Sequence, residues 1–372
     1  MSFLWYDSQL IQAYLEDKRQ CPGLTENDLG HPYSKKFYKL NQLFSPEPLG
    51  MIHDISGHVP HPLNVITRNP YEYYNETRTF GQVCLDTAKK IADHTDRPLI
   101  VTWSGGIDST SVLVAMLQTV PWDRITVVCS QRSINEYPEL YKDIIKPHLK
   151  TIDFSTWFST FQDYFTVSGD AGDTVWAVID NDFYQGHHES RNRLWSDWID
   201  QNIMPDLEFV EEFCNWSQVN IKTVLDLRAW FYLCCKWQDK SMKFFTDCPG
   251  MTDLTGSPFY DFDNSFRAWT MNNLDKIIAD SWKQYKMPAK QFIHDFHPCD
   301  NYLQNKTKEQ SVDIVSRNEY WKLINGHCRF AIDENYVSHG FPSWPFLDMY
   351  QLQDFNKIHN LIPMEYLCAK ID

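Results

Sequence analysis

The sequence predicts an α/β protein built on a doubly wound parallel sheet, with a mainly helical C-terminal half. The first observation is that short apolar runs alternate with helical stretches from Pro98 onward, as in PLIVTW, STSVLVAMLQTV and RITVVCS. Buried strands of a parallel sheet form such continuous apolar runs, and a helix usually connects one strand to the next. The second observation is that amphipathic aromatic segments such as RLWSDWIDQNI replace this pattern after Asp173, which favours helices.

These patterns divide the chain into four parts. Residues 1–95 are rich in Pro, His and Tyr, and we expect an irregular arm that ends in one helix. Residues 96–180 are predicted to form the α/β core. Residues 181–315 would form a helical region that completes the active site, and residues 316–372 a C-terminal extension.

The composition argues against two classes of partner. A formal net charge of -15 repels nucleic acid and anionic lipid, so we expect no nucleic-acid partner. No apolar run reaches the roughly 18 residues that a membrane span requires, so we expect no membrane contact. The 10 cysteines form no C-x-x-C pair, and no secretory segment follows Met1, which predicts reduced thiols in a cytoplasmic protein.

A glycine-bearing turn follows the first apolar strand and precedes a helix. Two glycines allow the backbone to approach a phosphate closely, and the N–H groups at a helix start attract anions. Serine and threonine hydroxyls add further donors. The candidate phosphate-binding residues here are Trp103, Ser104, Gly105, Gly106, Asp108, Ser109 and Thr110.

Asp108 extends this prediction to a metal ion. Its carboxylate would repel a bound polyphosphate unless a divalent cation lay between the two, so we expect Asp108 to bind Mg²⁺. The alternative is that Asp108 caps the helix and that the glycines serve a tight turn. The spacing and the lysine of the Walker motif are absent, so simple transfer of the γ-phosphate is not indicated.

The stretch YFTVSGDAGDTVW repeats this arrangement. An apolar strand runs into Ser168 and Gly169, and Asp170 and Asp173 open a second helix. Ligands of doubly wound sheets lie outside the carboxyl ends of the strands, so both turns would hold one ligand. Asp173 would then share the metal ion with Asp108.

The two turns resemble known phosphate-binding loops. SGGIDST resembles the pyrophosphate-binding loop (PP-loop) of the N-type ATP pyrophosphatases, which implies an adenine nucleotide α-hydrolase-like fold for residues 96–180. SGDAGD resembles the S-G-E-G-[SA]-D-E loop of asparagine synthetases and β-lactam synthetases, with Asp170 where they have Glu and Thr174 at their second Glu. The resemblance implies that ATP is cleaved between its α and β phosphates. It covers about residues 71–315.

Further catalytic candidates follow from this resemblance. GSPFYDFDNSF resembles the V-P-F-L-D segment of that family, and NKTKEQS resembles its R-x-K-[EQ]-[GQ]-F motif, which places Lys308 on the catalytic lysine. Lys306 replaces the arginine of that motif and Ser311 its phenylalanine. Lys308 would stabilise charge on the α-phosphate and on the later oxyanion, the alternative being a solvated surface charge.

Three assignments complete the predicted site. Asp170 is a catalytic candidate because of its place in the second loop. Glu136 would act as the base that deprotonates the amine, the alternative being an ordinary first-turn glutamate. Adenine would be held by the backbone near Trp103 and Val128.

The resemblance implies an ATP- and Mg²⁺-dependent ligase that joins a small-molecule carboxylate to an amine. Glutamine-using asparagine synthetases have an amidotransferase domain that starts with cysteine after the initiator Met, and residue 2 here is Ser. We therefore expect the amine to be free ammonia, ammonia from a separate partner, or part of the substrate. One alternative is a PP-loop enzyme that modifies a nucleobase precursor, as 7-cyano-7-deazaguanine synthase does. Another is a non-catalytic nucleotide-binding protein.

Overall fold

The computed structural model describes the central part of the chain and several short segments around it. The described residues are 3–6, 51–54, 75–153, 156–157, 160–176, 191–201, 210–211, 214–215, 220–233, 256–307, 331–333 and 336–337. Lys308 and most of the N-terminal arm and C-terminal extension lie outside them. Among the described residues, no helix has the length and apolar character needed to cross a bilayer.

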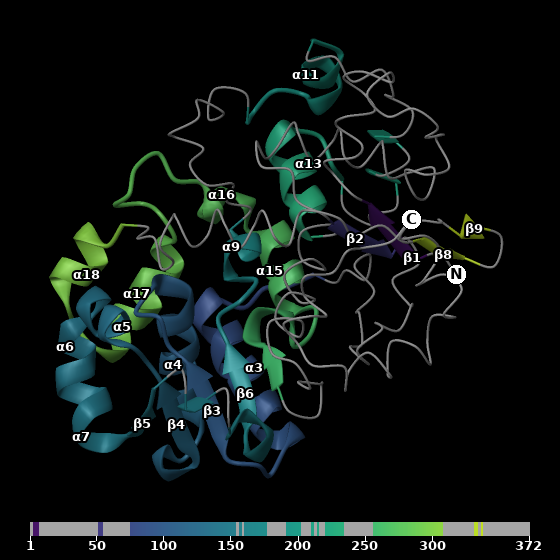
Figure 1. The fold of residues 1–372 in the computed structure, drawn as a ribbon. Helices are drawn as coiled ribbons and strands as arrows, with labels where there is room; N and C mark the ends of the chain where they lie inside the picture. The colour runs from purple at the N-terminus through teal and green to yellow at the C-terminus, as the bar shows by residue number, and fades with distance from the viewer. Residues whose placement is uncertain are drawn as a thin grey trace, which may run out of the picture.

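A five-stranded parallel sheet forms the centre of the described structure (Figure 1). Its strands, in their order across the sheet, are β5 (Lys150–Ile152), β4 (Ile125–Val128), β3 (Leu99–Thr102), β6 (Phe165–Ser168) and β7 (Gly256–Pro258). All four neighbouring pairs are parallel. The predicted parallel sheet of an α/β fold is therefore confirmed.

The order of the strands changes direction once. The chain moves outward from β3 through β4 to β5, then returns to the other side of β3 to form β6 and later β7. The carboxyl ends of β3 and β6 are level, because Thr102 pairs with Ser168 in the parallel register. The two segments that follow these strands consequently start side by side.

Apolar burial explains why β3 is central. Leu99, Ile100 and Val101 are all 0% exposed, as a strand covered on both faces requires. In β5 at the edge, Lys150 and Thr151 are exposed. The edge strand β7 has no apolar run that would reveal it in the sequence, and it adds a strand to the predicted helical half.

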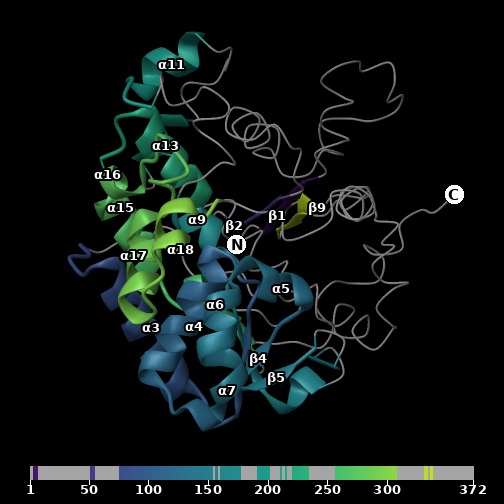
Figure 2. The same ribbon diagram turned by 90° about the vertical axis from the view of Figure 1, so that its left-hand side faces the viewer.

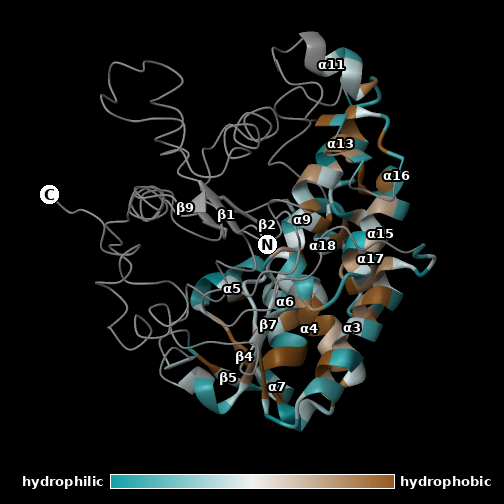
Figure 3. Ribbon diagram, turned by 90° about the vertical axis from the view of Figure 1, so that its right-hand side faces the viewer, coloured by the Kyte–Doolittle hydropathy of each residue, from teal (hydrophilic) through white to brown (hydrophobic). Residues whose placement is uncertain are grey.

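Four helices gather on one side of this sheet (Figure 3). They are α3 (Phe80–His94), α4 (Ile107–Thr119), α15 (Ser265–Asn272) and α17 (Met287–Phe296). Helix α3 packs against α4, and α17 packs against both. Thr79 begins α3 with a capping box, in which Thr79 Oγ1 accepts from Gln82 N and Thr79 N donates to Gln82 Oε1.

The remaining described helices are short (Figure 2). They are η3 (Trp122–Arg124), α5 (Gln131–Glu136), α6 (Pro138–Leu140), the π-helix η4 (Tyr141–Ile145), α7 (Lys146–His148), η5 (Phe161–Asp163), α9 (Gly172–Val175), α11 (Trp195–Gln201), α13 (Val224–Phe231), η8 (Phe259–Asp261), α16 (Leu274–Ile277) and α18 (Asp300–Asn305).

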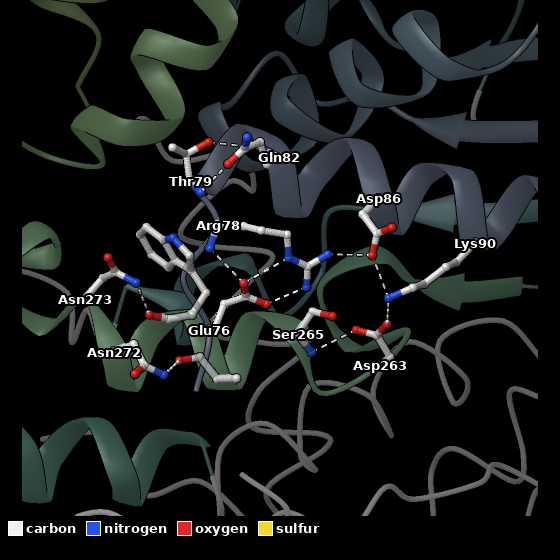
Figure 4. Close-up of polar contacts among 12 residues, drawn as sticks. Glu76, Arg78, Thr79, Gln82, Asp86, Lys90, Asp263, Ser265, Asn272 and Asn273 are labelled. Carbon is white, nitrogen blue, oxygen red and sulfur yellow. Dashed lines mark hydrogen bonds and ion pairs between the residues drawn. The ribbon is translucent and has the colours of Figure 1, made fainter. Parts of the chain in front are cut away.

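A chain of ion pairs connects α3 to the start of α15 (Figure 4). Asp86 Oδ2 lies 2.7 Å from both Arg78 Nη1 and Lys90 Nζ. Lys90 Nζ in turn lies 2.9 Å from Asp263 Oδ2, and Asp263 Oδ1 accepts a hydrogen bond of 2.8 Å from Ser265 N. Residues far apart in the sequence thereby connect the two helices by charge.

A second sheet has four short antiparallel strands in the order β2-β1-β8-β9. The strands are β1 (Phe3–Tyr6), β2 (Met51–Asp54), β8 (Ala331–Asp333) and β9 (Tyr336–Val337). Part of the predicted irregular arm thus pairs with part of the C-terminal extension. Neither β1 nor β2 is predicted from the sequence, because strands of four residues leave little pattern.

Candidate functional site

The first glycine turn connects β3 to α4 and is tightly enclosed. Gly105 has a φ of +80°, which L side chains rarely adopt. A Cβ atom added there would lie 2.4 Å from the carbonyl oxygen of Ser133 and 2.6 Å from Cβ of Glu136. Glycine is therefore required at this position both by backbone conformation and by the packing of α5 against the turn.

Hydroxyl groups hold the turn in shape. Ser104 Oγ and Ser109 Oγ are 2.9 Å apart, and Ser104 N donates to Ser109 Oγ at 3.1 Å. Thr110 is 0% exposed, and its Oγ1 accepts a hydrogen bond of 3.0 Å from Trp103 Nε1. The structure consequently places the Thr110 hydroxyl beneath the turn, where it supports Trp103, while Ser104 is partly exposed.

The second glycine turn touches the first. A Cβ atom added to Gly169 would lie 2.8 Å from Ser109 N, and one added to Gly172 would lie 2.5 Å from Cγ of Asp108. Ser168, at the end of β6, donates from Oγ to Oδ2 of Asp170 at 2.8 Å. The candidate residues of both turns are thus brought to one place, with Asp170 exposed at its rim.

A buried lysine joins the two turns. Lys286 Nζ lies 2.5 Å from Asp108 Oδ2 and 2.7 Å from Asp173 Oδ1. The side chain of Lys286 is 3% exposed, against 21% for Asp108 and 40% for Asp173. Burial lowers the pKa of Lys286, but the carboxylates of Asp108 and Asp173 outweigh it and hold that pKa well above its ordinary value.

Tyrosines enclose this ion pair. The hydroxyl of Tyr260, just after β7, donates to the backbone oxygen of Asp108 at 3.0 Å. The ring of Tyr285 lies 5.2 Å from Lys286 Nζ, within the range of a cation–π contact. Burial raises the pKa of Tyr260 well above its ordinary value, so its hydroxyl stays protonated and acts as a donor.

A second buried ion pair lies on the other side of Gly105. Lys306 Nζ is 3.0 Å from Oε2 of Glu136, and the side chains are only 5% and 4% exposed. The Tyr302 hydroxyl donates to the backbone oxygen of Gly105 at 3.3 Å. Glu136 therefore has a contact that the sequence analysis does not predict, since its carboxylate neutralises Lys306 beside the first turn.

Lys290 is a third buried lysine. It lies in the first turns of α17, four residues after Lys286, which caps that helix. It is 0% exposed, and its Nζ donates to the backbone oxygen of Trp282 at 2.7 Å. Burial, with a smaller contribution from the charge of Lys306, lowers the pKa of Lys290 to about 8. Burying an ammonium group is costly without an anionic partner. Lys286 and Lys306 have carboxylate partners, whereas Lys290 contacts a neutral carbonyl oxygen, so a bound anion near Lys290 would reduce this cost.

The predicted adenine contacts are only partly accessible. The amide nitrogen of Trp103 donates to the carbonyl oxygen of Val128 at 2.9 Å. These two atoms are paired with each other, so a nucleobase would have to use other backbone groups at the ends of β3 and β4.

The carboxylates of Asp108 and Asp173 both contact the ammonium group of Lys286, and two carboxylates this close together are suitable ligands for Mg²⁺. Among the residues that the structure describes, no group of three or more His, Cys, Asp and Glu side chains forms a metal site. Asp108 and Asp173 nevertheless fit Mg²⁺, because this ion commonly takes one or two carboxylates and completes its coordination with phosphate oxygens and water.

The most central residue of the site is not predicted from the sequence. Lys286 is separated by 178 residues from Asp108 and by 113 residues from Asp173. Its surroundings, YKMPAK, contain only a proline that favours a helix start. No local signal connects this lysine to the two turns.

Comparison of the chain with models of known protein families finds no match, and a search of curated proteins finds no relative.

Proposed function

We propose that this protein is an ATP-dependent carboxylate–amine ligase of the asparagine synthetase type, with a doubly wound PP-loop fold. It would adenylate a small carboxylate, release pyrophosphate and then form an amide with ammonia or another amine. The observation that carries this proposal is the contact between the two glycine turns, with Asp108 and Asp173 on a single cation.

The position of the two turns supports nucleotide binding. They follow β3 and β6, the neighbouring strands at which the strand order changes direction. Ligands of open α/β sheets bind in the crevice at such a switch point. The first turn also leads into α4, whose 13 residues provide an aligned helix dipole with its positive end at the turn.

The chain's own residues suggest how pyrophosphate would be held and released. Asp108 and Asp173 would hold Mg²⁺, which when bound neutralises the pyrophosphate leaving group. Ser104 would donate a hydrogen bond to phosphate oxygens from the first turn, and Ser168 would do so from the second turn once its hydroxyl releases Asp170. Lys286 lies between the carboxylates and would contact phosphate oxygens as a point charge.

Lys308 and Asp170 remain proposed catalytic residues on the basis of the resemblance, and Glu136 on the basis of its place after the second strand of the predicted core. Lys308 would stabilise charge on the α-phosphate and on the oxyanion formed by amine attack. Glu136 would have to release Lys306 before it could accept a proton from the amine. The amine would come from free ammonia, from a partner protein in the cytoplasm, or from the substrate.

The test is exchange of labelled pyrophosphate into ATP, measured with the full chain across a panel of carboxylates. We expect exchange with one acid, and AMP as the nucleotide product once an amine is added. The Asp108→Asn variant should lose exchange by about 100-fold or more, because it removes a metal ligand and transition-state charge stabilisation. Asp93→Asn, an exposed aspartate in α3, is the matched control.

The alternative functions predict different results in this experiment. Exchange that Asp108→Asn leaves unchanged, or formation of ADP, would contradict the proposal. Binding of MgATP without exchange in the presence of any acid would favour a non-catalytic nucleotide-binding protein. ATP cleavage that depends on a nucleobase precursor would favour the nucleobase-modifying alternative. Among the described residues, the free cysteines form no cluster with other metal ligands.

A further inference from the structure

Lys286 occupies the position where the proposed ligase would hold its metal ion. Its ammonium group contacts both carboxylates, at 2.5 Å from Asp108 and 2.7 Å from Asp173. The contact is enclosed by protein, since the Lys286 side chain is 3% exposed. An ammonium ion and a magnesium ion cannot both occupy the space between the same two oxygens.

The charges of this contact favour a divalent cation. One ammonium group lies against two carboxylates. A divalent cation would carry as much charge as the two carboxylates together and would release Lys286. The backbone of Lys286 is held, because its carbonyl oxygen accepts hydrogen bonds from the amides of Ala289 and Lys290 in α17, each at 3.0 Å. An exchange of partners would therefore be a movement of the Lys286 side chain alone.

The release of Lys286 is favourable only when another anion is present. Displaced by metal alone, the ammonium group would be left charged, buried and without its carboxylate partners, which is unfavourable. A polyphosphate that arrives with the metal provides new oxygen partners for the ammonium group. The free-energy cost of moving the Lys286 ammonium group from the carboxylates to the phosphate oxygens would then be small.

We propose that Lys286 holds the place of the divalent cation when nucleotide is absent, so that the site takes up metal only as a metal–nucleotide complex. This inference rests on the proposed ligase function. It assigns Lys286 two sets of partners: the carboxylates of Asp108 and Asp173 in the free protein, and phosphate oxygens in the complex.

The experiment is a titration of the full chain with Mn²⁺, followed by electron paramagnetic resonance of the unbound ion, with and without α,β-methylene-ATP. Wild-type protein should bind Mn²⁺ well only with the analogue. The Lys286→Met variant should bind Mn²⁺ alone at least about 10-fold more tightly than the wild type, a difference of about 1.4 kcal/mol. Lys283→Met, an exposed lysine of the same segment, should behave like the wild type.

Each result decides between the two proposals. If Lys286→Met gains no affinity for Mn²⁺ alone while the wild type still binds Mn²⁺ with the analogue, the inference about Lys286 is wrong and the ligase proposal stands. Equally tight binding of Mn²⁺ alone by the wild type and the variant also overturns the inference. If neither protein binds Mn²⁺ with the analogue, both proposals fail.

The wild type and a second variant keep the test valid if Lys286→Met does not fold, as judged by circular dichroism. Lys286→Gln keeps a polar side chain between the carboxylates and should also gain affinity for Mn²⁺ alone. The wild type provides its own test, because tight binding of Mn²⁺ without the analogue would overturn the inference.

Discussion

Individual glycine positions control the shape of the candidate site. Gly105 has a positive φ and no space for a side chain, whereas its neighbour Gly106 has a φ of -71° and a nearest contact of 3.3 Å to Ser104 Oγ. The two glycines look equivalent in the sequence, yet only the first is required by its backbone conformation.

We expect Gly105→Ala to lower the free energy of unfolding by about 2–4 kcal/mol, because left-handed strain adds to a steric clash with Ser133 and Glu136. Gly106→Ala should cost about 1 kcal/mol or less. Urea denaturation of the two variants, followed by circular dichroism, measures the difference. Equal losses would show that the turn has a different conformation in solution.

The buried lysines show that the role of a single residue cannot always be predicted from its local sequence. Ser104, Asp108, Ser168 and Asp173 lie next to or near glycines in a strand-to-helix context, and the two turns that carry them touch in the structure. Lys286 has no such context, because a lysine is normally a surface residue. Its importance comes from burial against carboxylates that are distant in the chain.

Contacts between whole helices depend on charge as well as on apolar packing. The ion pairs from Asp86 through Lys90 to Asp263 connect α3 with the start of α15. Burial raises the pKa of Asp263, but the hydrogen bonds from Lys90 and Ser265 outweigh it, so the net pKa lies below its ordinary value of 3.8. The folded state therefore binds this proton less readily than the unfolded state.

The consequence is a stability contribution that depends on pH. It is fully present above about pH 4 and is lost as the pH falls through the lowered pKa of Asp263. Asp263→Asn should therefore destabilise the protein at pH 7, by about 1 kcal/mol or less because the pair is partly exposed. This loss should shrink below pH 4. Thermal unfolding from pH 3 to 8 checks it, with exposed Asp123→Asn as the control. A loss that stays constant with pH would contradict the assignment.

The sheet as a whole determines where the site lies. Its central strand β3 is bonded on both sides, by β4 and by β6, whereas among the described strands β5 pairs only with β4. The two glycine turns extend from β3 and β6, whose residues are almost all buried. The candidate site is therefore built on the ends of two well-packed strands.

Hydrogen exchange should reflect this arrangement. The amides of β3 are expected to exchange only through global unfolding, and those of β5 at least about 10-fold faster through local opening. Native-state hydrogen exchange measured by mass spectrometry on peptides from each strand tests this. Strand β4, which has partners on both sides, should behave like β3. Equal protection of β3 and β5 would show that the edge is covered by another part of the chain.

Local physical chemistry accounts for the features that can be read from the amino-acid order. Buried strands need apolar runs, and a backbone that approaches an anion needs glycine, so the parallel sheet and both turns follow from short stretches of residues. The pairing of β1 with β8, the strand β7 and the contacts of Lys286 follow only from the folded chain. The reason is distance along the sequence. These contacts join residues 90 or more positions apart, whereas local patterns describe only near neighbours.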